Sequence, residues 1–279
     1  MGHPHLHWNF ALPVLLPIAV YVALYVWRFR QARKEAGGRG AGWPQALAFA
    51  GSVTVLMIAT VSPIDRLGED YLFSAHMVQH ILLGDIAPLL LLLSLSRVIM
   101  RPATRRFHAI ERKMGRFAHP TTFIVAWLAL VYFWHIPALY NGALEHPALH
   151  ALEHATFFTA GTLLWWPLIQ PVPMRHKLTG MQGLLYVFAA KATLGVLGLY
   201  LTWSHNVAFD YYNHVPRIWD LTAIADQNVG GAIMMVEQAL LLLFVFFMLF
   251  MRMLSQSEEA ERRRERLEDA AALEDAAAV

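Results

Sequence analysis

The chain contains apolar runs about 20 residues long, and this feature limits its fold more than any other. Seven such runs lie at 10–27, 44–62, 72–96, 119–140, 147–169, 182–203 and 228–251. A helix rises about 1.5 Å per residue, so a helix of this length crosses the hydrocarbon core of a bilayer. The sequence therefore predicts an all-α integral membrane protein, folded as a bundle of seven transmembrane helices.

Lys and Arg residues fall almost entirely on one side of this predicted bundle. Nineteen of the 22 lie in the odd-numbered connections between the runs or in the tail from residue 252 onward. Only Arg66 and Arg217 lie in the even-numbered connections, and Lys191 lies inside a run. Because short cytoplasmic loops retain basic residues, we predict an external N-terminus and a cytoplasmic C-terminus.

Composition narrows the classes of partner and metal site. The basic residues form an orientation signal and lack the aromatic interleaving of a nucleic-acid interface, so membrane lipid, and no nucleic acid, is the expected surrounding. The chain has no cysteine, which excludes disulfides and thiolate metal sites. Any bound metal must therefore use His, Met or carboxylate side chains.

The domain organisation predicted from the sequence is simple. Residues 1–9 form an external His-rich tail, 10–252 a seven-helix transmembrane domain, and 253–279 a charged cytoplasmic tail. The acidic and basic residues that alternate in the last segment are typical of a solvated helix. Alternating His3, His5 and His7 are able to hold Cu(II), although an unstructured tail explains them equally well.

Histidines gather on the predicted external side. Eleven of the 14 fall there: His3, His5, His7, His76, His80, His135, His146, His150, His154, His205 and His214. His76 and His80 are four residues apart, as are His150 and His154, so each pair stacks on one face of its helix. His135 lies about one turn from the external end of its own run. Three helices thus bring imidazoles to one depth in the membrane.

This pattern favours a metal or cofactor site. A single His in a membrane helix more often ties helices together, but repeated ionisable groups in hydrocarbon are costly and usually functional. Imidazole suits copper, zinc and iron, whereas the thioethers of Met77 and Met234 select Cu(I), so copper is the leading metal. We expect Glu153, Asp226 and Gln227 to orient the ligands. Zinc with three His and a water, and haem with two axial His, remain alternatives.

Three charged residues lie deeper in the runs. Asp85, Lys191 and Glu237 fall at a similar depth on three different helices. An unpaired charge in hydrocarbon is expensive, so we expect Lys191 to pair with Asp85 or Glu237 inside the bundle. A structural ion pair and a proton or ion path both fit this arrangement.

Five sequence segments carry a resemblance to a known family. They are Ser62-Pro63-Ile64-Asp65, His76-Met77-Val78-Gln79-His80, Phe133-Trp134-His135-Ile136-Pro137, the stretch from His150 through Glu153-His154 to Trp165-Trp166-Pro167, and Asp226-Gln227 with Gly230-Gly231 and Met234. In this order they resemble the multi-spanning CtaG-like family of cytochrome c oxidase assembly factors. The single-span copper-insertion factors that share the name depend on cysteine, and this chain has none.

The resemblance implies an assembly factor of the bacterial inner membrane rather than an enzyme. Such a protein would bind copper, as Cu(I) by the chemistry above, near the external face and support its delivery to the catalytic subunit of a haem-copper oxidase. A periplasmic copper donor would be a second partner. The predicted ligands are His76, His80, His135, His150 and His154.

Three other functions fit the same residues. A zinc-dependent intramembrane hydrolase would use Glu153 or Asp226 as its general base. A b-type haem membrane protein would take axial His residues from two helices, for instance the third and the fifth. A structural chaperone for the oxidase would use the imidazoles only to tie helices together and would hold no metal.

Overall fold

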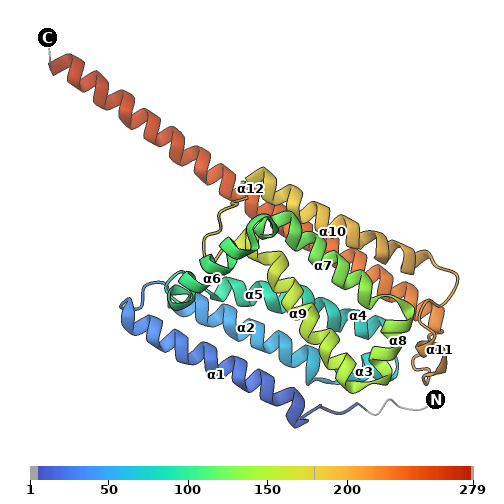
Figure 1. The fold of residues 1–279 in the computed structure, drawn as a ribbon. Coiled ribbons are helices and arrows are strands. Elements are labelled where there is room, and N and C mark those ends of the chain that lie inside the picture. The colour runs from blue at the N-terminus through green and yellow to red at the C-terminus, as the bar shows by residue number, and fades with distance from the viewer. Residues whose placement is uncertain (1–5, 179, 278–279) are drawn as a thin grey trace.

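The computed structural model describes residues 6–178 and 180–277, and in these residues it contains helices and no strand (Figure 1). The helices are α1 Leu12–Glu35, α2 Trp43–Thr60, α3 Pro63–Asp70, α4 Phe73–Ile81, η1 Leu82–Ile86, α5 Ala87–Ser94, α6 Arg101–Met114, η2 Gly115–Ala118, α7 Pro120–Trp134, α8 Pro137–Glu145, α9 Pro147–Ile169, α10 Gly180–Trp203, α11 Tyr211–His214 and α12 Ala223–Ala277. η1 is a π-helix and η2 a 3-10 helix. His3 and His5 of the predicted N-terminal tail lie outside the described residues.

Among the described residues, five helices are long and apolar enough to cross a membrane, or six if one bent pair counts as a span. The five are α1, α2, the continuous segment Phe73–Ser94, α10 and the first part of α12, and the bent pair is α6–η2 with α7, at 79°. α9 is absent from this set although its 23 residues suffice in length. It carries His150, Glu153 and His154, which lower the hydropathy of its membrane-length segment.

The fourth predicted span, 119–140, does not form one helix. α7 ends at Trp134, His135 caps it, and α8 begins at Pro137. Proline has no backbone N–H and disfavours helical geometry in the residue before it, so the helix stops there. α3, α7 and α9 also begin at a proline, the residue that best tolerates the first position of a helix. His135 therefore lies at a break between two helices and not within a span.

The last helix is much longer than the run predicted at 228–251. α12 has 55 residues and continues through the predicted charged tail without a break. Figure 1 shows its C-terminal part leaving the bundle as a single helix. On this part Arg264 donates to Glu268 at 2.9 Å, an i,i+4 pair of the kind that supports an exposed helix.

Two helix pairs pack backbone against backbone. A Cβ placed on Gly161 of α9 would lie 1.8 Å from the carbonyl oxygen of Gly84 in η1. A Cβ on Gly231 of α12 would lie 2.6 Å from the backbone nitrogen of Thr202 in α10. Small residues let membrane helices approach this closely. Such packing matters in a membrane because lipid supplies no hydrophobic force that would bring helices together.

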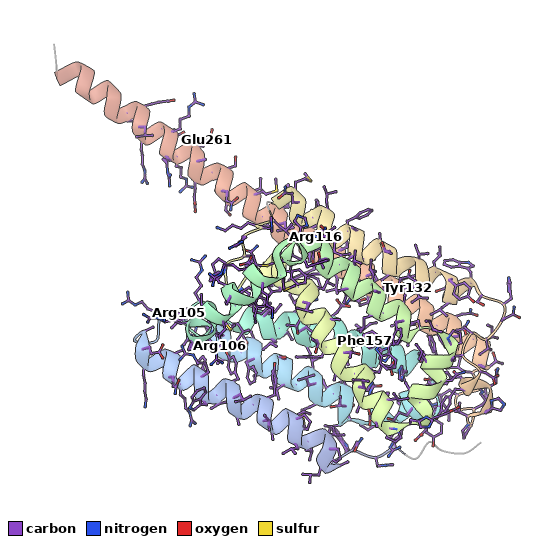
Figure 2. The ribbon with its side chains drawn as sticks, in the orientation of Figure 1. Arg105, Arg106, Arg116, Tyr132, Phe157 and Glu261 are labelled. Atoms are coloured by element: carbon purple, nitrogen blue, oxygen red, sulfur yellow. The ribbon has the colours of Figure 1, made fainter. Side chains whose placement is uncertain are left out.

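The two ends of the bundle differ in character. Figure 1 places α3, α8 and α11 together at one end. Figure 2 shows Arg105, Arg106 and Arg116 at the opposite end, from which α12 protrudes, with Phe157 between the two ends. The histidine-bearing parts of α4 and α9 lie between Phe157 and the end formed by α3, α8 and α11.

The contact between α9 and η1 gives a test of the packing. We expect Gly161→Ala to lower the stability of the purified protein by at least about 1–3 kcal/mol, because the added methyl group meets backbone and not a movable side chain. Thermal unfolding in detergent measures this change. Gly195→Ala in α10 is the matched control, since a Cβ there meets nothing within 4 Å. Equal unfolding temperatures for the two variants would contradict the close contact.

Candidate metal centre

Four ionisable side chains from two helices meet in the bundle. His76 and His80 come from α4, and Glu153 and His154 come from α9. Each offers one ligand atom, and these four atoms all lie within 4.8 Å of one another. The Glu153 carboxylate lies between the α4 imidazoles, with Oε1 3.5 Å from His80 Nε2 and Oε2 4.0 Å from His76 Nε2. We call this group the His/Glu site.

The His/Glu site is buried and its polar atoms have almost no hydrogen-bond partners. His76 is 0% exposed and Glu153 1% exposed. Both ring nitrogens of His76 and of His80, Nε2 of His154, and both carboxylate oxygens of Glu153 make no hydrogen bond. Buried polar groups in proteins are nearly always paired, because an unpaired one loses its hydration without compensation. A cation bound among these atoms would supply that compensation.

The donor set has a definite chemistry. Three imidazoles and one carboxylate are ligands for borderline metals such as copper and zinc. The i,i+4 spacing of His76 and His80 places both on the same face of α4, as predicted. Glu153 was predicted to support the ligands, and the structure places its oxygens among them. Met77 and Met234 are buried, and together with His80 they line a small cavity beside this group.

His150 stands beside the His/Glu site and is held by another residue. Its Nδ1 lies 2.7 Å from Glu69 Oε1 of α3, while its Nε2 has no partner. Its ring is 4.0 Å from the ring of His154 and 5.4 Å from that of His76, measured between centroids. Sequence reasoning missed Glu69, because only the tertiary structure brings α3 against α9.

His135 lies on the other side of His80, at the break between α7 and α8. The centroids of the two rings are 6.3 Å apart. His135 Nδ1 is 2.7 Å from the carbonyl oxygen of Val131, and its Nε2 is buried without a partner. The five predicted ligands therefore occupy one region, but His135 and His150 flank the four-residue group and do not belong to it.

Asp226 and Gln227 act on the backbone around the site and do not contact the imidazoles. Asp226 is 0% exposed, and its two oxygens accept hydrogen bonds from the backbone nitrogens of Phe73, at 2.7 Å, and Ser74, at 3.1 Å. These donors are the orphan N–H groups at the start of α4. Gln227 accepts from the Ala208 nitrogen at 2.6 Å and so fixes the connection before α12.

A second polar pair fixes the register of α4. Gln79 donates from Nε2 to the Asp65 carboxylate at 2.7 Å and to the carbonyl oxygen of Ala59 at 2.8 Å. Asn9 donates to the other Asp65 oxygen at 2.8 Å. Burial, with a contribution from Glu69, raises the pKa of Asp65, and these two hydrogen bonds oppose the rise. Asp65 thus connects the N-terminal segment to the helix that carries His76 and His80.

Buried aromatic residues cover the site. Tyr140 of α8 stacks on Phe209 with centroids 3.9 Å apart and lies 5.3 Å from the His76 ring. Tyr212 of α11 donates from its hydroxyl to the carbonyl oxygen of Gly68 at 2.7 Å. All three aromatic residues are buried. The connection between α10 and α12 therefore folds inward over the His/Glu site.

A pocket of about 750 Å³ opens at the same end of the bundle. Its lining includes the carboxylates of Asp70, Glu145 and Asp210. Asp70 directly follows Glu69, the residue that holds His150. The pocket thus contains the residue next in sequence to Glu69, whose carboxylate contacts His150 beside the His/Glu site.

The three deep charges meet. Lys191 Nζ donates to Asp85 and lies 3.8 Å from Glu237 Oε1, so the ammonium contacts both carboxylates. Trp127 and Trp165 place their rings 5.1 and 5.3 Å from the same ammonium. We had expected one partner for Lys191, and the structure supplies two. Lys191 is 1% exposed, so this ion group is sealed from solvent.

Comparisons with known proteins agree with the resemblance found in the sequence. The sequence profile of the family described as cytochrome c oxidase caa3 assembly factor (Caa3_CtaG) matches residues 23–256. Uncharacterized proteins of Mycobacterium bovis and Mycobacterium tuberculosis are each 27% identical over 269 residues. In each, the match covers 84% of this chain and 40% of the relative, so the chain spans less than half the length of these curated relatives. No solved structure matches.

The deep ion group gives a second test. We expect Lys191→Met to destabilise the protein by about 3–5 kcal/mol, because it leaves buried carboxylates without their cation. Lys191→Met/Asp85→Asn removes one of these carboxylates and should recover part of the loss. Thermal unfolding in detergent measures both variants. A single variant as stable as the wild type would show that the ion group does not support the fold.

Proposed function

This chain belongs to the family of cytochrome c oxidase caa3 assembly factors, and we propose that it binds one copper ion at the His/Glu site and supports its delivery to the oxidase. His76, His80, Glu153 and His154 hold the ion. The copper is cargo: the protein keeps it out of water and presents it to a partner. The role is that of an assembly factor and not of an enzyme.

One observation carries this proposal, namely four donor side chains, three buried and His154 half-buried, whose ligand atoms converge and are almost without hydrogen bonds. Hydrocarbon-buried groups of this kind need compensation. The deep charges obtain it from one another through Lys191. The His/Glu site holds no Lys or Arg, and a metal cation is the partner that its donor atoms fit.

The donor set accepts copper and zinc alike, and we propose copper because of the family to which the chain belongs. A haem-copper oxidase requires copper at its catalytic subunit, so an assembly factor with a buried imidazole cluster is best explained as a copper carrier. Of the two general bases considered for a zinc hydrolase, Asp226 already accepts two backbone hydrogen bonds, and we assign Glu153 as a metal ligand. Haem is disfavoured because the cavity lined by His80 and His135 has a volume of only about 30 Å³, far too small for a porphyrin.

We further propose that the protein lies in the bacterial inner membrane with seven spans, α9 and the broken α7–α8 region included. The end formed by α3, α8 and α11 then faces outward, because Arg105, Arg106 and Arg116 gather at the opposite end. In this orientation the His/Glu site lies on the periplasmic side of the bundle, the side of a periplasmic copper donor. The protruding part of α12 lies in the cytoplasm. The catalytic subunit of the oxidase receives the copper on the external side.

Replacement of the α4 ligands tests the proposal. We expect wild-type protein, purified in detergent without a His tag, to hold nearly stoichiometric copper, and His76→Ala/His80→Ala to lose it. Mass spectrometry of the metal measures the content. Membranes of cells carrying the variant should show reduced caa3-type oxidase activity, because the oxidase would lack its copper.

The control is His205→Ala/His214→Ala, which removes two exposed external histidines. This variant should keep both its copper and the oxidase activity. Unchanged copper in His76→Ala/His80→Ala would reject the site. Zinc with hydrolytic turnover, or iron with a Soret band, would replace the proposed function by one of its rivals.

A further inference from the structure

A second group of possible metal ligands surrounds a small cavity below the His/Glu site. The cavity has a volume of about 30 Å³, and its lining includes Met77, His80, Asp85, His135, Met234 and Gln238. About 10–15 Å³ of such space holds one water, so a single metal ion fits. Its walls come from α4, η1, α7, α9, α10 and α12, which makes it an internal feature of the bundle.

His135 is prepared as a ligand in this cavity. The hydrogen bond to the carbonyl oxygen of Val131 requires the proton to be on Nδ1. Nε2 therefore keeps its lone pair, and it is buried with no hydrogen-bond partner. Metal-binding histidines are characteristically held in this way, with the other ring nitrogen donating to a backbone carbonyl.

Two methionines from different helices share the cavity with His135. Met77 of α4 is 1% exposed and Met234 of α12 is 5% exposed. Methionine commonly fills gaps in cores because its side chain is flexible. Here the two methionines line a void instead of closing it. Thioether sulfur is a soft donor that selects Cu(I) over zinc and Cu(II).

We propose that Met77, Met234 and His135 form a second metal site that is selective for Cu(I). It rests on the proposed function for the identity of the metal, but it uses different ligands. His80 lines this cavity and also belongs to the His/Glu site, so the two sites adjoin through one imidazole. The chain would thus hold copper at two neighbouring positions, of which only the deeper one has sulfur ligands.

The charges around the cavity are compatible with a monovalent cation. Asp85 lines the cavity and is bound to Lys191. Glu237 provides a second carboxylate 3.8 Å from the same ammonium. Two carboxylates thus flank one ammonium. The Lys191 group therefore does not repel a cation bound at the methionines.

X-ray absorption of the full-length protein, reduced and loaded with Cu(I) without oxygen, tests this site. We expect sulfur as well as nitrogen neighbours around copper in the wild type. Met77→Leu/Met234→Leu should lose the sulfur neighbours and one equivalent of bound Cu(I), since leucine fills similar space without a donor atom. Each single variant should lose one sulfur neighbour, which provides a second reading if the double variant folds poorly.

Met235→Leu is the matched control. Met235 adjoins Met234 on α12 but lines a different cavity and accepts a hydrogen bond from Thr202 at 3.7 Å. This variant should keep the sulfur neighbours and the full Cu(I) content. Zn(II) binding at the His/Glu site should remain in Met77→Leu/Met234→Leu, which shows that the bundle is intact.

Two results would overturn the second site. One is copper in the wild type that has only nitrogen and oxygen neighbours. The other is a sulfur signal that survives in Met77→Leu/Met234→Leu. Either result leaves the His/Glu site standing if copper still depends on His76 and His80. Loss of the proposed function would appear differently, as copper content that is indifferent to those two histidines.

Discussion

The contact between Gly161 and the backbone at Gly84 is the constraint on which the site depends. It lies four residues after His80 on one chain segment and two turns after Glu153 on the other, so it sets how close α4 and α9 can approach. Both helices run in the same direction from the end near α3. Imidazoles that lie one to two turns from such a contact are therefore brought close to one another. Phe157 packs against the His80 ring, with centroids 4.3 Å apart.

The bundle contains two clusters of buried ionisable groups, and they differ in whether a cationic side chain is present. Asp85 and Glu237 share the ammonium of Lys191, so this group contains a cation of its own. His76, His80 and Glu153 are equally buried but lack a cation of their own. In hydrocarbon an uncompensated polar cluster is unfavourable. This difference is the reason for proposing that the His/Glu site binds a metal cation and that the Lys191 group is structural.

The surroundings of the site are built to hold α4 in one position. Asp226 binds the first backbone N–H groups of this helix, and Gln79 ties its middle to Asp65 and Ala59. Tyr140 and Phe209 cover it from the end near α8. Metal ligands keep their geometry only when a supporting shell fixes them. Here that shell contacts the backbone of α4 and the side chain of Gln79, and the ring nitrogens of His76 and His80 make no hydrogen bond.

The sequence by itself determined the helical membrane class, the family and the pairs His76/His80 and His150/His154, because these follow from local properties: run length, charge bias and the period of a helix. The sequence also contains Pro137, which ends the helix in the fourth run, although run length alone predicted a continuous span there. Only the tertiary structure decided that Glu153 joins the imidazoles, that Glu69 takes His150, that Asp226 serves the backbone, and that Met77 and Met234 share a cavity with His135. The physical reason is that these contacts join residues far apart in the chain, and their geometry depends on how closely helices pack, which no local period encodes.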